Sequence, residues 1–224
     1  MYKTEPHLHS FPLSSCSHLP VDDLIRRHGE AGYATVILAD HFSRYHYAKL
    51  ELYLKRTLTW EEYVDQFYQT WEAAKAAGEK YGVRVLFAVE LSLSVGHFLL
   101  YGVDRAFLLS RPDVFELTPD ALHAHARANG VTVIQAHPLR DGLCTPYPEQ
   151  VDGFEVFNSH PRHNNENDRV RQIADRYPHL LRTVGSDVHR PEDVGGSAVL
   201  SETPIESVEQ YLELLRSGKA QFEM

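Results

Sequence analysis

Short apolar runs, each followed by a polar residue that can bind a metal, alternate along this chain with segments of helical periodicity. The apolar runs cover residues 34–39, 83–89, 97–101, 131–136, 154–157 and 180–184, and a further strand is expected from Tyr2. Continuous apolar runs of this length suit parallel strands that are covered on both faces. Their alternation with helices predicts an α/β fold built on a parallel sheet or barrel.

Helical patterns fill the segments between these runs. Residues 21–31 and 164–177 carry apolar stripes, and Thr59-x-x-Glu62 is a capping box that opens a long helix to about residue 81. Helices are also expected from Thr118-Pro119, and from residues 203–206 to a stop at Gly218. Residues 42–58 interrupt the alternation and are interpreted as an inserted loop, either solvated with aromatic anchors or shaping a substrate site.

Composition narrows the class of protein. A chain of 224 residues with 43% hydrophobic residues predicts a single domain over 1–224. We expect neither a membrane span nor a secretory signal, since no apolar run reaches about 18 residues and the N-terminus lacks an apolar region. Cys16 and Cys144 are too few for a disulfide framework, so the cytoplasm is the expected compartment. A net charge of −9 argues against binding extended duplex nucleic acid but permits a small phosphorylated substrate or a nucleic acid end.

Most of the metal-type side chains stand where an apolar run ends, and the ends of parallel strands are where barrel enzymes gather their catalytic groups. They are His7-x-His9, Asp40-His41, Glu90, His97, His137-Pro138 and Asp187-x-His189. Strand periodicity places His7 and His9 on one face, and the two oxygens of Glu90 could bridge two cations. Bringing so many titratable groups together without a cation would be costly, so the pattern predicts a metal centre.

In their order and spacing these motifs resemble the PHP family, named for polymerase and histidinol phosphatase. The residues that carry the resemblance are His7-Leu8-His9, Ala39-Asp40-His41, Val89-Glu90, His97, Ala136-His137-Pro138 and Gly185-Ser186-Asp187-Val188-His189. The resemblance extends over about residues 5 to 200. It implies a distorted seven-stranded (β/α)7 barrel related to the TIM barrel, two or three divalent metal ions, and phosphoester hydrolysis.

The same resemblance implies a role for each motif residue. The first metal would be held by His7, His9, Glu90 and Asp187, the second by Glu90, His97 and His137, and the third by His41 and His189, with Asp40 orienting a histidine ligand. One position departs from the family pattern, because Ser14 and Ser15 stand where an Asp or His usually binds the third metal. His18 is the preferred substitute, and Cys16 is a less favoured one.

The mechanism that fits is metal-assisted hydrolysis, in which a hydroxide bridging two cations attacks phosphorus. The ligands Glu90, Asp187 and His189 are the predicted catalytic residues, and a mixed set of His and carboxylate ligands suits zinc, manganese or iron. An arginine often completes a phosphate site. The substrate-contact candidates are Arg44, Arg140, His160, Arg162 and Arg190.

Three classes of function stay open at this stage. The preferred one is a stand-alone phosphoesterase acting on a small phosphorylated metabolite, of which a histidinol phosphatase-like enzyme is one example, or on a nucleotide or nucleic acid end. The second is an exonuclease, proofreading or non-catalytic module; no attached polymerase segment is expected. The third is an amidohydrolase-type metal enzyme, which Glu90 with Asp187-x-His189 fits poorly. The sequence leaves the oligomeric state open.

Overall fold

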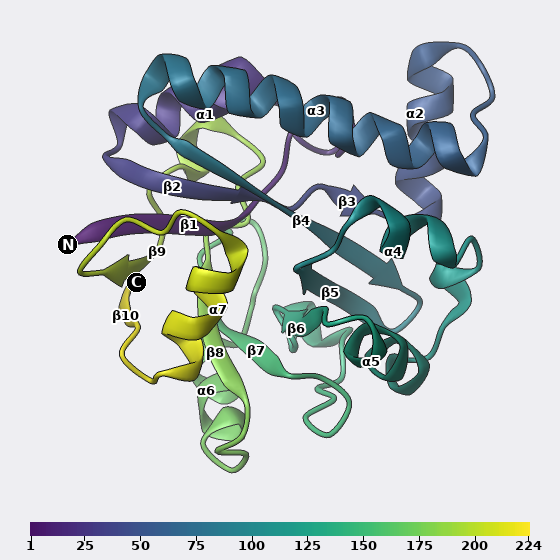
Figure 1. Ribbon diagram of the computed structural model, residues 1–224. Coiled ribbons are helices and arrows are strands. Elements are labelled where there is room, and N and C mark those ends of the chain that lie inside the picture. Colours follow the sequence, from purple (N-terminus) through teal and green to yellow (C-terminus); the bar gives the residue numbers. More distant parts are fainter.

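The computed structural model describes residues 1–224, in which strands and helices alternate around a curved sheet (Figure 1). The strands are β1 (Tyr2–Leu8), β2 (Tyr33–Leu38), β3 (His41–Phe42), β4 (Arg84–Leu93), β5 (Gly96–Tyr101), β6 (Thr132–Ala136), β7 (Gly153–Asn158), β8 (Leu181–Gly185), β9 (Ala198–Ser201) and β10 (Gln221–Glu223). The helices are α1 (Val21–Glu30), α2 (Arg44–Leu54), α3 (Trp60–Tyr81), α4 (Arg105–Ser110), α5 (Pro119–Ala128), α6 (Asn167–Ala174) and α7 (Val208–Arg216). The expected α/β class is therefore confirmed.

The sheet has the strand order β10-β9-β1-β2-β4-β5-β6-β7-β8, and β3 pairs with β4 outside this path. It nearly closes on itself, because Leu8 at the end of β1 bridges Val188 just beyond β8. The backbone N–H of Asp187 also donates to the carbonyl of His7 at 2.8 Å. The result is a barrel-like sheet that brings the carboxyl ends of β1 and β8 together.

The structure does not reproduce a regular sevenfold β/α repeat. β5 pairs antiparallel with both β4 and β6, and it follows β4 after a two-residue turn without an intervening helix. β9 and β10 are also antiparallel and extend the sheet beyond β1. They bring the chain ends close together, with Lys3 Nζ 2.6 Å from Glu223 Oε1. Antiparallel neighbours such as β4 and β5 need only a tight turn between them, so no helix separates these two strands.

Most element boundaries follow from local signals in the sequence. Thr59 and Glu62 form the expected capping box of α3, and α5 begins with Pro119. The interpretation of residues 42–58 as a loop was wrong, since most of them form the helix α2, whose N-cap is Ser43, and Phe42 belongs to β3. The exposed aromatic residues Tyr45 and Tyr53 obscured this helix, because they give it no clean apolar stripe.

The last two helices are also shorter than expected. α6 covers only residues 167–174, because Glu166 adopts a left-handed conformation with φ 49° just before it. α7 starts after Ser207 and not after Thr203, since the hydroxyl of Thr35 on β2 donates to the carbonyl of Ile205 and helps to hold the preceding segment extended. None of the helices combines the length and apolarity needed to cross a lipid bilayer.

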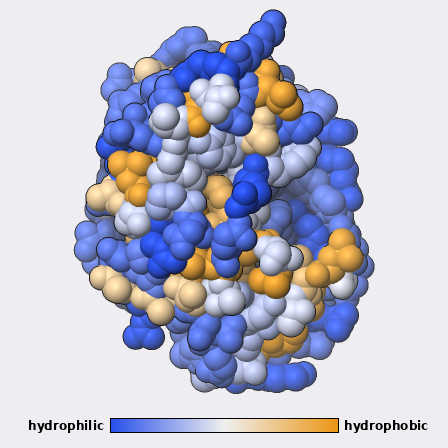
Figure 2. Space-filling view, turned by 90° about the vertical axis from the view of Figure 1, so that its right-hand side faces the viewer, coloured by the Kyte–Doolittle hydropathy of each residue, from blue (hydrophilic) through white to orange (hydrophobic).

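The apolar core is divided between two clusters. The larger lies between the sheet and α3, α5, α6 and α7, and the smaller joins α1 and α3 to β1 and β2. Figure 1 shows α3 running along the side of the barrel above β2 and β4. The adjacent face of the molecule is mostly hydrophilic with separate hydrophobic patches (Figure 2). Polar side chains, and not these two apolar clusters, fill one end of the barrel.

Candidate metal centre

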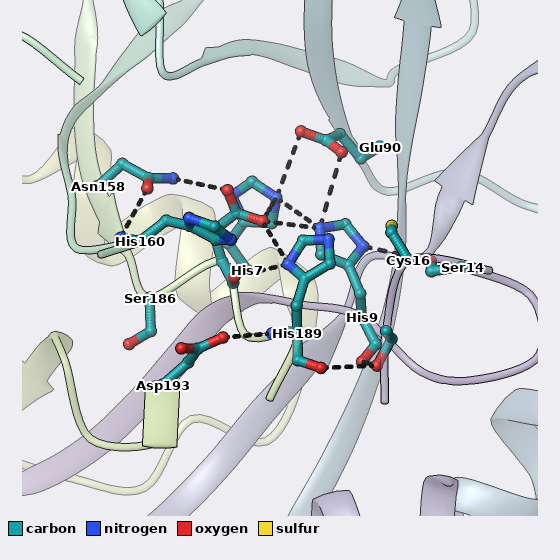
Figure 3. Close-up of polar contacts among 12 residues, drawn as sticks. His7, His9, Ser14, Cys16, Glu90, Asn158, His160, Ser186, His189 and Asp193 are labelled. Carbon is teal, nitrogen blue, oxygen red and sulfur yellow. Dashed lines mark hydrogen bonds and ion pairs between the residues drawn. The ribbon is translucent and has the colours of Figure 1, made fainter. Parts of the chain in front are cut away.

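All of the motif side chains apart from Asp40 converge at one end of the barrel. His7 and His9 lie at the end of β1, Glu90 on β4, His97 on β5, His137 after β6, and Asp187 and His189 after β8. All of these except His97 are buried. Figure 3 shows the rings of His7 and His9 turned toward Glu90, with His189 beside them. The structure therefore brings together side chains that are up to 182 positions apart in the sequence (189 − 7).

Glu90 lies at the centre of this group and is fully buried. Its Oε1 atom lies 3.1 Å from His137 Nε2, 3.3 Å from His97 Nδ1 and 3.3 Å from His7 Nε2. Its Oε2 atom lies 2.5 Å from His41 Nδ1 and 3.7 Å from His9 Nε2. A carboxylate with imidazoles around each oxygen has the arrangement required of a bridging ligand.

A second group forms where β1 meets the segment after β8. The Nε2 atoms of His7 and His9 are 3.1 Å apart, and Asp187 Oδ1 lies 3.1 Å from His9 Nε2 and 3.6 Å from His7 Nε2. His189 Nδ1 is 3.4 Å from the same oxygen. Ligand atoms of His7, His9 and Asp187 all lie within 4.8 Å of one another, as do those of His9, His41 and His189.

Hydrogen bonds on the far sides of the rings test whether these residues fit a cation. His7 Nδ1 lies 2.8 Å from Glu155 Oε1, an acceptor, so this nitrogen carries a proton and Nε2 is the nitrogen that faces the other ligands. The hydroxyl of Ser14 donates to Asp40 Oδ1 at 2.7 Å and can accept from His9 Nδ1 at 3.4 Å, which leaves His9 Nε2 with a lone pair. Nε2 of His7 and Nε2 of His9 therefore face each other beside carboxylates, where a cation can replace a proton shared between them. The residues fit divalent metal ions.

Ionisation of the group favours the same chemistry. Burial raises the pKa of Glu90, but the nearby His97, His41 and His7 outweigh this effect and hold it well below its usual value. Burial together with Arg140 lowers the pKa of His137 to about 4, so this imidazole is neutral at pH 7. Metal ligands of these types must be deprotonated, and Glu90 and His137 already are. Burial lowers the pKa of His41, but Glu90 outweighs this effect and raises it to about 10, and Glu155 likewise raises the pKa of the buried His7, so these two imidazoles would lose a proton when a cation binds.

Glu155 is a site residue that the sequence did not reveal. It lies on β7 and is 1% exposed, and its carboxylate accepts from His7 Nδ1, from the His137 backbone N–H at 2.9 Å and from Asn158 Nδ2 at 2.9 Å. It therefore fixes the orientation of His7 and of the strand end that carries His137. The available signal was an acidic residue inside an otherwise apolar strand run, which is costly to bury without a partner.

The loop after β1 explains the role of Asp40. Asp40 accepts from the Ser10 backbone N–H and hydroxyl, both at 2.6 Å, and from the Ser14 hydroxyl. Asp40 therefore orients a histidine through Ser14 and not by direct contact. Ser14, which stands where a third-metal ligand was expected, is fully buried and connects Asp40 to His9.

His18 does not occupy the place that the sequence suggested for it. Its side chain is exposed, and its backbone N–H donates to the His189 carbonyl at 2.8 Å. It belongs to none of the metal-type clusters, whereas Cys16, His41 and His46 form one. The Ser14–Ser17 turn directs Cys16 toward the site, and His46 went unnoticed because it lies in the segment interpreted as a loop.

The substrate-contact candidates separate into two groups. Arg140 lies against the metal-type cluster, with its guanidinium 2.5 Å from Asp187 Oδ2 and 3.0 Å from Asn158 Oδ1. His160 is buried near Asp187 and His189.

Of the other arginines, Arg162 reaches the edge of the cluster, where its Nη2 lies 3.2 Å from His160 Nε2. Arg162 donates to Asp193, which itself accepts from the backbone of His189 and Arg190. Arg44 is exposed and pairs with Glu116, away from the cluster, so we do not retain it as a contact. The Arg190 side chain has no ion pair or hydrogen bond with a cluster residue.

The backbone is strained where two ligands leave their strands. His137 has φ 30° and Asp187 has φ 53°, a region that non-glycine residues rarely adopt. Such strain is typical of functional sites, where the surrounding structure maintains it. At Gly185, a Cβ atom would lie 2.2 Å from Glu155 Oε1 and 2.7 Å from His7 Cβ. Glycine is needed because these side chains approach the backbone closely.

Comparison with known families and sequences gives one match. Residues 164–220 match a family model described as PHP-associated. No curated protein sequence matches the chain.

Solved structures share the fold at low sequence identity. A two-domain protein from Bacteroides vulgatus, described as containing a predicted PHP-like metal-dependent phosphoesterase, superposes with a TM-score of 0.68 at 17% identity, covering 100% of this chain and 64% of that one. The lesion-specific endonuclease EndoQ from Pyrococcus furiosus gives 0.62 at 14% identity, covering 99% and 57%. An amidohydrolase from Chromobacterium violaceum gives 0.59 at 16% identity, covering 97% of each chain. This chain therefore spans less than two thirds of the first two proteins.

Proposed function

We propose that this chain, a PHP-domain protein by its family match and structural neighbours, catalyses metal-dependent hydrolysis of a phosphoester. The observation that carries the proposal is the convergence of histidines from several strands on Glu90, with ring nitrogens of His7 and His9 facing each other. Divalent cations would replace the protons that these nitrogens otherwise share with one another and with the carboxylates. Strands β1, β2 and β4 to β8 would then correspond to the seven-stranded barrel of the family.

We assign two cation positions by the contacts around the carboxylates. His7, His9 and Asp187 form one group of ligand atoms beside Glu90. His97 and His137 form a second group, which meets the first at Glu90 Oε1. Zinc, manganese and iron all accept such mixed ligand sets. When bound, divalent cations stabilise the charge of a phosphoryl group and make water a nucleophile near neutral pH.

The protein's own groups would position the substrate. Arg140 is the arginine whose guanidinium contacts the Asp187 carboxylate, and it could exchange that contact for a phosphoryl oxygen. Arg140 and His7 help to hold the pKa of Asp187 well below its usual value despite burial, so Asp187 stays ionised and does not donate a proton. The proton for the leaving oxygen would therefore come from His189 or from solvent.

A small polar substrate fits the surroundings of this centre. An open pocket of about 600 Å³ adjoins it, lined mainly by polar residues that include Asn158, His160, His163 and Arg169. The net charge of −9 disfavours a long duplex. We therefore place a phosphorylated metabolite or nucleotide first, and a nucleic acid end second because one structural neighbour is named an endonuclease.

The amidohydrolase alternative rests on the name of another neighbour. Its expected marker is a bridging lysine, whereas a buried glutamate holds the central position here. A non-catalytic module is disfavoured because the set of His and carboxylate ligands is nearly complete. An amidohydrolase would hydrolyse an amide in preference to a phosphoester, and a non-catalytic module would hydrolyse neither.

The test is to remove the metals and titrate zinc, manganese or iron back in the presence of a nitrophenyl phosphomonoester, a phosphodiester and an anilide. We expect metal-dependent release of nitrophenol from at least one phosphoester, and loss of it in Glu90→Ala. Glu213→Ala, at an exposed position of α7, is the control that should keep full activity. Hydrolysis of the anilide alone, or wild-type turnover by Glu90→Ala, would contradict the proposal.

A further inference from the structure

A thiol and a histidine that neither the family motifs nor the two assigned cation positions use lie at the open edge of the site. Cys16 is exposed, and its Sγ atom is 3.6 Å from Nε2 of the buried His46. Ligand atoms of Cys16, His41 and His46 all lie within 4.8 Å of one another. Figure 3 shows Cys16 beside His9 at the edge of the histidine cluster.

The start of α2 prepares His46 as a ligand. Ser43, the N-cap of this helix, accepts from the backbone N–H of His46 at 3.1 Å and lies 2.9 Å from its Nδ1. A proton on Nδ1 can therefore be held by Ser43, which leaves a lone pair on Nε2 directed at Cys16. Ligating histidines typically have such a partner on the other ring nitrogen. His46 is only 8% exposed, so water offers Nε2 little compensation.

His41 connects this pair to the rest of the centre. Its ring stacks on that of His46 with centroids 4.4 Å apart, and its Nδ1 lies 2.5 Å from Glu90 Oε2. Both of these atoms are buried, and neither has a hydrogen-bond partner of acceptable geometry. A close contact between a nitrogen and a carboxylate oxygen without a hydrogen bond is expected where both face a cation.

We propose that Cys16 and His46, together with His41, bind a divalent cation through a thiolate. The inference rests on the metal centre proposed above and adds to it a ligand set that replaces the missing acidic residue of the third position. Bonds of about 2.3 Å to sulfur and about 2.05 Å to nitrogen at a tetrahedral angle place the two atoms about 3.6 Å apart. The observed separation of Sγ and Nε2 is 3.6 Å.

The thiolate gives this position a different metal preference from the rest of the centre. Sulfur ligands select zinc and other soft cations over magnesium, calcium and manganese. We therefore expect zinc or cobalt at the Cys16 position even when manganese occupies the positions around Glu90. A substrate entering from solvent would meet this cation first, because Cys16 is the exposed member of the set.

Cobalt titration of the metal-free full chain tests the inference without using turnover. Wild type should develop the near-ultraviolet charge-transfer absorption of a thiolate bound to cobalt, and so should Cys144→Ser, the matched control. Cys16→Ser should lose this absorption and bind one cobalt fewer. His46→Ala should weaken the same cobalt at least tenfold. Cys16→Asp should keep the cobalt count without the absorption.

Three results would overturn the inference. Cobalt binding to wild type without the absorption would refute the thiolate ligand while leaving the centre around Glu90 intact. An unchanged absorption in Cys16→Ser would place the thiolate elsewhere. Failure of wild type to bind any cobalt, zinc or manganese would refute the metal centre itself together with this position. As a second readout, bound zinc should slow alkylation of Cys16 at least tenfold and leave that of Cys144 unchanged.

Discussion

Replacement of Glu155 by glutamine tests whether His7 is held in the tautomer that a metal ligand needs. Glu155 Oε2 accepts two hydrogen bonds, from the His137 backbone and from Asn158, whereas Oε1 accepts only from His7 Nδ1. A glutamine has one acceptor oxygen, and two donors compete for it on the Oε2 side. Its amide NH₂ would then face His7 and drive the ring proton to Nε2, the nitrogen that faces the other ligands.

The expected loss of metal affinity follows from the role of Glu155 in orienting His7. Loss of the group that orients a ligating histidine typically weakens metal binding by roughly 10- to 100-fold, which corresponds to about 1.4–2.8 kcal/mol. Glu5 offers a matched control, because it is equally buried on β1 but accepts only backbone N–H groups, from His7 and Ser186, through one oxygen. Burial raises the pKa of Glu5 to about 7, so at that pH Glu5→Gln removes about half a charge.

The assay is a competition between the protein and a chromogenic chelator for zinc. Glu155→Gln should show the stated loss in affinity with an unchanged far-ultraviolet circular dichroism spectrum, and Glu5→Gln should stay within about threefold of wild type. Wild-type affinity in Glu155→Gln would refute the argument that Glu155 fixes the tautomer of His7. An equal loss in both variants would instead indicate a general effect of removing a buried carboxylate.

Three further predictions concern stability. Gly185→Ala should destabilise the protein by about 1–3 kcal/mol through overpacking against Glu155 and His7; an unchanged melting temperature would contradict the contact. Burial lowers the pKa of His28 to about 4, below its unfolded value of about 6.5, so the stability that neutral His28 contributes is lost as pH falls from 6.5 toward 4. In urea titrations, His28→Leu should therefore reduce the difference in the free energy of unfolding between pH 7 and pH 4.5 by about 2–3 kcal/mol. An unchanged difference would refute this. Metal saturation at about 1,000 times Kd should add about 4 kcal/mol to stability, which calorimetry with and without a chelator would detect.

The sequence was sufficient for the arrangement of the cluster because its signals are local. An apolar run followed by a polar residue indicates a strand that delivers that side chain to the site, whichever strands are neighbours. Glu90 and His137 were identified in this way, and His7 by its His-x-His spacing, and the structure brings them together with Asp187, although β4 continues past Glu90 to Leu93. The capping box at Thr59 is local in the same sense.

Features that depend on contacts between distant segments were missed. Glu155 acts on His7, which is 148 positions away, and nothing near it in the sequence indicates that contact. The antiparallel β5 follows from pairing with β6, and the need for Gly185 follows from the space left by two other strands. His46 was overlooked because its helix lacks a clear apolar stripe, so the choice between His18 and Cys16 could only be made in three dimensions.

Anomalous X-ray scattering from crystals of the metal-loaded protein tests the central claim most directly. The account predicts at least two peaks that share Glu90, one of them about 2.0–2.2 Å from Nε2 of His7 and His9 and the other at the same range from His97 and His137. A peak about 2.3 Å from Cys16 Sγ would add the third. Metal-dependent activity in a protein whose peaks all lie away from Glu90 would contradict the account.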